Sequence, residues 1–153
     1  MIGDITERHH VMLLRMNTEF VHWLSPLDEA GLFYVLARAN YARQIDEAAG
    51  VLIGYAYDVD YPDHWNMAWL SMHLRNFFYI DRVIIDRAAQ GQGLGRKLYA
   101  DVEHYAWLAC EVNTQPNNPG SHAFHLSQGF ETLGAQEFPD KGKAVRYYAK
   151  AMN

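Results

Sequence analysis

The sequence predicts a single α/β domain, and three observations support this fold class. An aromatic and β-branched run over residues 77–85 is typical of a largely buried strand. A glycine-rich segment at residues 90–95 follows this run, and apolar residues at helical spacing come next. The chain has 153 residues, the size of one domain that buries roughly 70% of its unfolded surface. We therefore expect one domain over residues 1–153.

The part of the chain before residue 77 predicts a strand, a helix and a hairpin. Residues 11–14 form an apolar run, which we assign to the opening strand. Ser25 and Pro26 are residue types favoured at the N-cap and first position of a helix, so we expect a helix from there to about Ala39. The remaining expectations are a hairpin between residues 41–46 and 50–58, and a connection over residues 59–76 that has no clear period. A connection of that length in a compact domain is often functional.

Downstream of the glycines, helical and strand patterns alternate. Leu94, Leu98, Val102, Tyr105 and Ala109 recur at helical spacing and indicate an amphipathic helix. The elements expected after it are a short strand at residues 110–113, a helix over residues 118–130 that Gly129 closes, and two strands at residues 131–138 and 144–149 joined by an exposed turn.

The segment Gln90-Gly91-Gln92-Gly93-Leu94-Gly95 predicts an anion site. Glycines let the backbone approach a ligand, and the free N–H groups at a helix start attract phosphate. A dinucleotide fingerprint requires G-x-G-x-x-G, but Arg96 stands where the third glycine should be. No Gly-Lys-Ser/Thr follows, which argues against a nucleotide-triphosphate loop. We therefore expect a different phosphorylated cofactor.

Two ordered motifs give the chain a family resemblance. Gln90, Gly93 and Gly95 fit the pattern Gln/Arg-x-x-Gly-x-Gly/Ala, and Asn118 to Phe130 looks like an Asn-x-x-Ala segment with its terminal Gly-Phe. In these residues the chain resembles the GNAT superfamily of acetyl-coenzyme A-dependent N-acetyltransferases. The resemblance covers residues 77–130, about a third of the chain. It implies a mixed, mainly antiparallel central sheet flanked by helices, with acetyl-CoA as co-substrate and no metal.

The resemblance also implies where the coenzyme binds. The backbone around Val83 and Ile85 would align the pantetheine arm and offer an N–H to the acetyl oxygen. Asn118 would support the pantetheine or the loop beside it, and residues 90–95 would hold the pyrophosphate. The full set of expected coenzyme contacts is Val83, Ile84, Ile85, Gln90, Gly91, Gln92, Gly93, Leu94, Gly95, Arg96, Asn118 and Ser121.

The proton donor departs from the commonest family pattern. Four residues before Gly129, where many family members carry a tyrosine that can protonate the leaving thiolate, this chain has His125. Histidine can donate or accept a proton near neutral pH, so His125 is a candidate acid. The alternative is that His125 only packs or hydrogen-bonds beside the coenzyme. His122, one turn earlier, is a second candidate.

Three residues are candidates for the base that takes the proton from the amine. Tyr79 and Asp81 are two apart in a strand, so they are expected to share a face with Val83 and Ile85. Asp81 then accepts the proton directly or through water, unless it only pairs with a basic group such as Arg82 or Arg87. Glu111 is a third candidate, because in this fold its strand should diverge from the Val83 strand to admit the coenzyme.

An aromatic and acidic cluster before the cofactor strand is the candidate amine site. It suits a cation through charge pairing and cation–π contacts, and it favours a small amine or an exposed N-terminus over an acidic substrate. The alternative is that the aromatic side chains close the core or a dimer interface. The cluster consists of Tyr55, Tyr57, Asp58, Asp60, Tyr61, Asp63, His64, Trp65 and Trp69.

Composition narrows the class of protein. A net charge of −5 and a pI near 5.8 argue against a nonspecific nucleic-acid binder. The N-terminus lacks a signal-peptide pattern and no apolar run is long enough for a membrane span, so we expect a cytoplasmic protein. Cys110 is the only cysteine and is read as a small core residue rather than a nucleophile. The aromatic content is compatible with a homodimer.

Together these features predict an N-acetyltransferase that moves an acetyl group from acetyl-CoA directly to a primary amine. A noncatalytic module that senses acyl-CoA and passes that state to a partner is the alternative.

Overall fold

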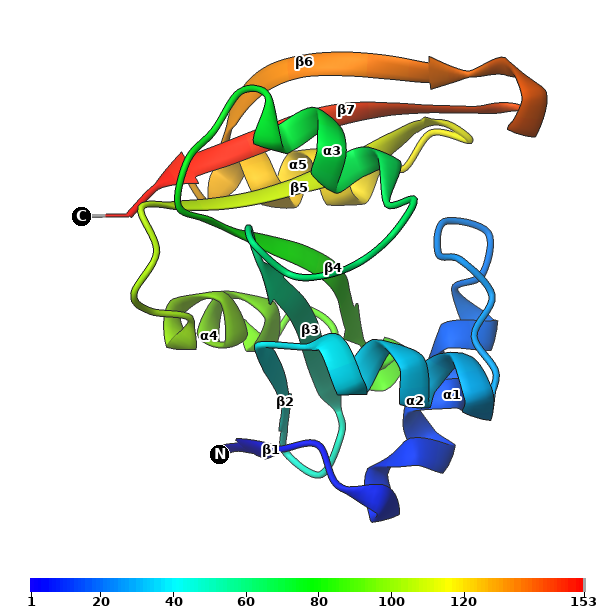
Figure 1. The fold of residues 1–153 in the computed structure, drawn as a ribbon. Coiled ribbons are helices and arrows are strands. Elements are labelled where there is room, and N and C mark those ends of the chain that lie inside the picture. Colours follow the sequence, from blue (N-terminus) through cyan, green and yellow to red (C-terminus); the bar gives the residue numbers. More distant parts are fainter. Residues whose placement is uncertain (153) are drawn as a thin grey trace.

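A computed structural model describes residues 1–152 and shows one α/β domain built on a seven-stranded sheet (Figure 1). The strand order is β1-β2-β3-β4-β5-β7-β6, and every neighbouring pair is antiparallel except β4 and β5. The predicted fold class is therefore confirmed. The strands are β1 (Ile2–Asp4), β2 (Tyr41–Ile45), β3 (Gly50–Ala56), β4 (Phe77–Ile85), β5 (Trp107–Gln115), β6 (Glu131–Phe138) and β7 (Lys143–Ala151).

Helices cover both faces of the sheet. Leu13 of α1, Leu32 of α2 and Leu70 of α3 share one core cluster, whereas Leu98 of α4 and Phe124 of α5 belong to a second. The helices are α1 (His10–Glu19), α2 (Glu29–Arg38), α3 (Trp65–Ser71), α4 (Leu94–Asp101) and α5 (Pro119–Ser127), with short 3-10 turns η1 (Glu7–His9), η2 (Arg87–Ala89) and η3 (Pro139–Lys141). Alternation along β3 separates the clusters, because Val51 and Ile53 join the first and Leu52 the second.

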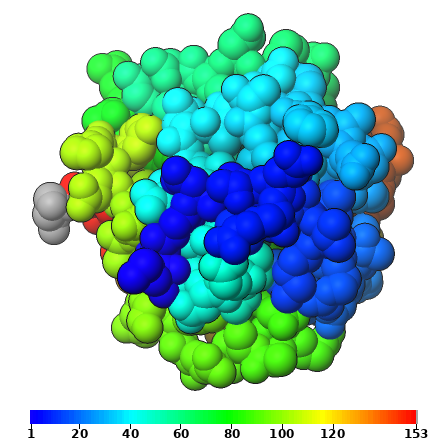
Figure 2. Space-filling model, turned by 90° about the horizontal axis from the view of Figure 1, so that it is seen from below, coloured from blue at the N-terminus to red at the C-terminus, as the bar shows by residue number. Residues whose placement is uncertain are grey.

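The N-terminal segment lies along one end of the molecule beside the β2–β3 turn (Figure 2). The amino group of Met1 lies 2.6 Å from Oδ1 of Asp46 in that turn. The predicted opening strand at residues 11–14 is wrong, because these residues belong to α1 and the opening strand is β1. Val11 is 80% exposed while Leu13 and Met16 are fully buried, so the apolar residues mark one side of a helix.

The second helix begins three residues later than predicted. Asp28, not Ser25, is the N-cap of α2, and its carboxylate accepts a hydrogen bond from the Gly31 backbone N–H at 2.8 Å. The predicted end near Ala39 is correct, because Ala39 is the C-cap. Residues 20–28 instead form a loop between α1 and α2, which Arg82 binds through the Ser25 carbonyl at 2.9 Å.

Two other boundaries also differ from the sequence prediction. The connection over residues 59–76 contains α3, and the helix after the glycines ends at Asp101 instead of continuing through Ala109. Val102 and Tyr105 still pack in the second core cluster, but Ala109 already lies in β5. Their apolar spacing therefore reflects burial of the segment that follows the helix. Both predicted hairpins, β2–β3 and β6–β7, are confirmed.

Candidate active site

The two parallel strands at the centre of the sheet separate part of the way along. Among residues 1–152, β5 pairs with no residue of β4 beyond Tyr79, whose partner is Ala109. A cavity of about 940 Å³ fills the opening, and residues of both strands line it. We call it the large cavity. The predicted divergence of these strands is confirmed, and it leaves one edge of β4 available to an extended ligand.

The glycine-rich segment lines one end of the large cavity. Gly91 and Gly93 adopt φ angles of 82° and 78°, in the left-handed region that favours glycine. Apart from each glycine and its two chain neighbours, no atom of residues 1–152 lies within 4 Å of a Cβ built on Gly91 or Gly93, so a ligand has room to approach the backbone. Arg87 and Arg96 line the same cavity, and α4 begins directly after Gly93. Free N–H groups and guanidinium groups together suit an anion such as a pyrophosphate.

Except for Gln92, every residue of the predicted coenzyme-binding set lines the large cavity. Gly95 has a packing reason of its own, because a Cβ there would lie 3.2 Å from the ring of Phe124 in α5. Asn118 caps α5, since its Oδ1 accepts a hydrogen bond from the Ser121 backbone N–H at 3.3 Å. The close approach of Gly95 to Phe124 packs α4 against α5, and residues of both helices line the cavity. Whether the predicted residues contact a coenzyme stays a prediction.

A bulge in β4 changes which side chains share a face. The register against β3 shifts between Ile53 and Gly54, whose partners are Arg82 and Ile80, so Asp81 is an extra residue. Tyr79 therefore packs in the first core cluster, whereas Val83 and Ile85 pack against the second. The prediction that Tyr79, Asp81, Val83 and Ile85 share one face is wrong, because a bulge interrupts the two-residue alternation.

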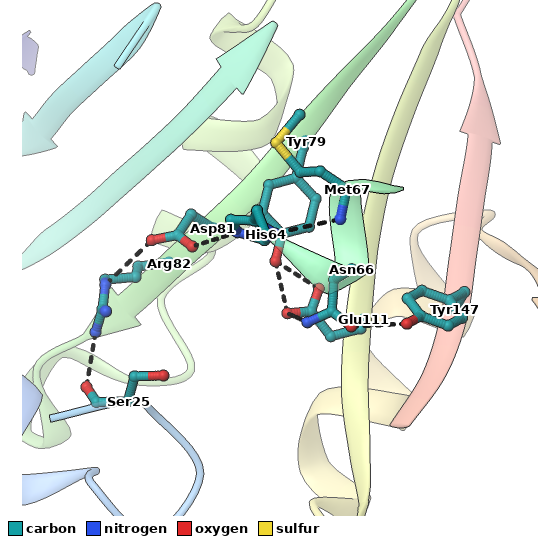
Figure 3. A network of polar contacts seen from close by, with 9 residues as sticks. All are labelled: Ser25, His64, Asn66, Met67, Tyr79, Asp81, Arg82, Glu111 and Tyr147. Atoms are coloured by element: carbon teal, nitrogen blue, oxygen red, sulfur yellow. Dashed lines mark hydrogen bonds and ion pairs between the residues drawn. The ribbon is translucent and has the colours of Figure 1, made fainter. Parts of the chain in front are cut away.

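Glu111 of β5 receives hydrogen bonds from two segments (Figure 3). The Tyr79 hydroxyl lies 2.6 Å and 2.7 Å from its two carboxylate oxygens, and Asn66 Nδ2 donates to Oε1 at 3.0 Å. Asn66 is held in turn by the Tyr147 hydroxyl, which donates to its Oδ1 at 2.7 Å. Burial raises the pKa of Glu111 to about 7, while the hydrogen bond from Tyr79 acts in the opposite direction. A carboxylate with this pKa can accept a proton near neutral pH.

Asp81 belongs to a separate set of ionic contacts. Its Oδ2 lies 3.2 Å from Nε of Arg82, and its Oδ1 lies 3.8 Å from Nε2 of His64 (Figure 3). Arg82 also donates to Oδ1 of Asn17 at 2.6 Å and to the Ser25 carbonyl at 2.9 Å. Of the two roles that the sequence allows for Asp81, the structure contains the ion pair with Arg82. The hydrogen bond from Arg82 to the Ser25 carbonyl holds the α1–α2 loop against β4.

His125 and His122 of α5 each contact a tyrosine. Nδ1 of His125 lies 2.8 Å from the Ser121 carbonyl oxygen, and its Nε2 lies 2.7 Å from the Tyr99 hydroxyl. His122 makes the same kind of contacts, to the Tyr148 hydroxyl at 2.7 Å and to the Asn113 carbonyl oxygen at 3.0 Å. Burial lowers the pKa of His125, so its neutral form is favoured. A role for His125 as a proton donor stays a prediction.

A smaller cavity of about 290 Å³ meets the large one at Glu111 and Asp81. We call it the small cavity. Of the predicted amine cluster, Tyr61, Asp63, His64 and Trp65 line it. Tyr55 is fully buried behind them, and Trp69 stacks on Tyr147 at a ring separation of 4.0 Å. Tyr57, Asp58 and Asp60 do not line it.

Sequence reasoning missed several side chains that form these cavities. Trp23 lines both cavities from the α1–α2 loop and donates from Nε1 to the Asn117 carbonyl at 3.0 Å. Asn66 and Tyr99 were missed as well. A tryptophan in a loop beside a Ser-Pro pair is only a weak indication of a cavity-lining residue. Nothing in the sequence indicates which residue Asn66 or Tyr99 contacts.

Three further observations bear on the chemistry. Cys110 is buried and burial raises the pKa of its thiol well above the usual value, which disfavours the nucleophilic thiolate. Among residues 1–152, no group of three or more His, Cys, Asp or Glu side chains could hold a metal ion. No helix in the same range is long and apolar enough to cross a membrane.

Comparison with known proteins identifies relatives by sequence family and by fold. The acetyltransferase (GNAT) family matches residues 9–130. A ribosomal-protein-alanine N-acetyltransferase from Brucella melitensis has a similar structure, with 20% identity, 99% coverage of both chains and a TM-score of 0.69. The ribosomal-protein-S18-alanine N-acetyltransferase from Escherichia coli has 16% identity, coverage of 99% of this chain and 92% of that one, and a TM-score of 0.68.

A third similar structure contains a ligand. Arabidopsis thaliana Naa50, in complex with the bisubstrate analogue CoA-Ac-MVNAL, has 13% identity, coverage of 99% of this chain and 98% of that one, and a TM-score of 0.67. No curated protein sequence matches the chain. At these identities the structural matches show a shared fold.

Proposed function

Because the chain belongs to the GNAT family of acetyltransferases, we propose that it transfers an acetyl group from acetyl-CoA directly to a primary amine. The observation that carries the proposal is the position of Glu111. Its carboxylate lies where the two cavities meet, with a pKa raised to about 7. A base there can reach an amine in the small cavity while a thioester lies in the large one.

The large cavity is the proposed coenzyme site. The glycine segment and the start of α4 would bind the pyrophosphate, with Arg96 adding positive charge, whereas Arg87 is already paired with Glu19 at 2.8 Å. The pantetheine arm would lie along the edge of β4 that β5 leaves unpaired. A backbone N–H near Val83 would then donate to the thioester oxygen as negative charge develops on it. The bound coenzyme supplies the activated acetyl group.

Glu111 is the proposed base, and Tyr79 and Asn66 are positioning residues. As the amine nitrogen forms a bond to the acetyl carbon, the carbon–sulfur bond would break and the coenzyme would leave as its thiolate, while Glu111 accepts the proton that the amine loses. Tyr79 and Asn66 hold the carboxylate through the three hydrogen-bond contacts described above. The buried Cys110 supports direct transfer over a covalent acetyl-enzyme, because burial keeps its thiol protonated.

Release of free coenzyme thiol across a panel of amines tests the proposal. An acetyltransferase releases thiol only when acetyl-CoA and an accepted amine are both present. A calorimetric titration with acetyl-CoA in the absence of amine measures binding separately. Binding without thiol release across small amines and peptide N-termini would contradict catalysis and favour the noncatalytic sensor.

A further inference from the structure

Two lysines line the small cavity at a distance from its acidic junction. Lys141 comes from η3 and Lys143 is the first residue of β7. Both are exposed, and within residues 1–152 neither ammonium lies within 4.0 Å of a carboxylate. Arg82 and Asp81, which also line this cavity, pair with each other, so the two lysines remain against the carboxyl groups of Asp63 and Glu111. The cavity therefore combines a proton acceptor at Glu111 with cations that are free to bind an anion.

The strand register places Lys143 on the same face as the Glu111 network. Tyr147 of β7 pairs with Glu111, and its hydroxyl bonds to Asn66. Val145 and Tyr147 pack in the same core cluster, and alternate residues of a strand share a face, so Lys143 shares it too. Lys143 lies four positions before Tyr147, which corresponds to about 13 Å along the strand.

This spacing fits an extended peptide. A chain of n residues spans at most about 3.3–3.6 Å × n, so 13 Å corresponds to roughly four residues, and fewer when a lysine side chain leans toward the junction. With the amino group at Glu111, a carboxylate on the second or third residue would reach Lys141 and Lys143. A free amino acid would place its carboxylate much nearer to Glu111.

Resting on the proposed function, we infer that the acceptor is a peptide amino terminus with a carboxylate side chain at its second or third residue, bound by Lys141 and Lys143. This differs from the expectation that an acidic substrate is disfavoured. That expectation was based on the residues before β4, whereas the two lysines come from η3 and from the first position of β7.

Paired peptides test the charge preference. Ala-Glu-Glu-Ala and Ala-Gln-Gln-Ala, both with an amidated C-terminus, differ only in their side-chain carboxylates. Each exposed ion pair contributes about 0.2–1 kcal/mol, so two pairs give the wild-type protein about a 2- to 30-fold higher kcat/KM for the glutamate peptide. The preference should appear mainly in KM and weaken as salt is added.

Substitutions assign the preference to the lysines. In the double variant Lys141→Gln and Lys143→Gln, we expect the two peptides to have equal kcat/KM. Arg146→Gln is the matched control, because Arg146 is an exposed cation on β7 that alternation places on the opposite face from Val145. It should keep the wild-type preference.

The outcomes separate this inference from the proposed function. Equal kcat/KM for the two peptides with the wild-type protein, or a preference that survives the double variant, would overturn the inference while acetyl transfer stands. Faster acetylation of free glutamate than of the glutamate peptide would also overturn it. Thiol release with small amines but with neither peptide would likewise overturn the inference and leave acetyl transfer in place. An absence of thiol release with peptides and amines alike would instead contradict the proposed function.

Discussion

The hydroxyl of Tyr99 lies 2.7 Å from Nε2 of His125, and Nδ1 of the same ring lies 2.8 Å from the Ser121 carbonyl oxygen. A carbonyl can only accept, so Nδ1 carries the proton in the neutral ring and Nε2 accepts from Tyr99. A donor role toward a leaving thiolate would need a proton on Nε2 as well. Burial, which lowers the pKa of His125, opposes that second proton.

From this geometry we expect Tyr99→Phe to lower stability more than turnover. It leaves Nε2 of a buried histidine without its donor, which costs about 1–3 kcal/mol. For a chain of this size that corresponds to a fall in Tm of about 2–4 °C per kcal/mol. Thermal melts measure the first effect and steady-state kcat the second. Tyr41→Phe, which removes a hydroxyl bonded to Asp101 outside both cavities, is the control.

The companion variant His125→Ala separates packing from acid catalysis. We expect it to lower Tm while kcat changes by less than tenfold, because general acid help would be worth about 10²–10⁴-fold. A folded variant that loses a hundredfold or more in kcat, measured where chemistry limits turnover, would instead support His125 as the proton donor.

Glu111→Gln should reduce kcat by about 10²–10⁴-fold if Glu111 is the base. The pH profile gives a sharper readout. A base must be deprotonated to act, so wild-type kcat/KM should rise with pH through about 7, the pKa of Glu111, and then level off. The Glu111→Gln variant should lack this rise in kcat/KM, whereas a rise caused by deprotonation of the amine substrate should appear in both proteins. Identical profiles for the two proteins would contradict the assignment.

The same carboxyl group predicts how stability depends on pH. Its pKa is raised from 4.5 to about 7, so between these values the native state holds a proton that the unfolded chain has lost. The free energy of unfolding from this group therefore falls as pH rises through that window. Relative to wild type, Glu111→Gln should gain Tm between pH 5 and pH 8. Glu137→Gln, an exposed change on β6, is the matched control. If the difference in Tm between wild type and Glu111→Gln stayed constant from pH 5 to pH 8, that result would argue against the raised pKa of Glu111.

The glycine segment could be predicted from sequence because its signal is local. Strand, glycines and helix lie within twenty-five residues, and each has a pattern of its own from Phe77 to Asp101. The opening strand was misassigned because a four-residue apolar run fits either period. The helical period becomes visible only when the pattern is followed to Met16, which is buried on the same side as Leu13.

The residues around Glu111 could not be predicted because they come from distant segments. Asn66 is 45 positions from Glu111, and Tyr147 is 81 positions from Asn66. The bulge at Asp81 is equally invisible, since it depends on the register of β4 against β3. Sequence alternation placed Tyr79 with Val83, whereas the bulge turns Tyr79 toward Glu111. The candidates themselves were recognisable by residue type, but their contacts depend on the tertiary fold.

Gly93→Asp and Gly95→Asp should separate coenzyme binding from packing. At Gly93 the positive φ costs a non-glycine residue about 1–2 kcal/mol, but the space around it is open, so the fold should persist. The new carboxylate would repel a pyrophosphate at the start of α4. Acetyl-CoA at a hundredfold excess over Kd should stabilise wild type by about 2.7 kcal/mol, and Gly93→Asp should lose most of this gain.

At Gly95 the first effect of the substitution is steric. The added Cβ would lie 3.2 Å from the Phe124 ring, so Gly95→Asp should lower Tm even without coenzyme. Melts of both variants with and without acetyl-CoA, together with circular dichroism at low temperature, distinguish the two effects. A folded Gly93→Asp protein with the full wild-type shift would show that the coenzyme does not bind at the glycine segment, because a carboxylate at the anion-binding turn would repel the pyrophosphate.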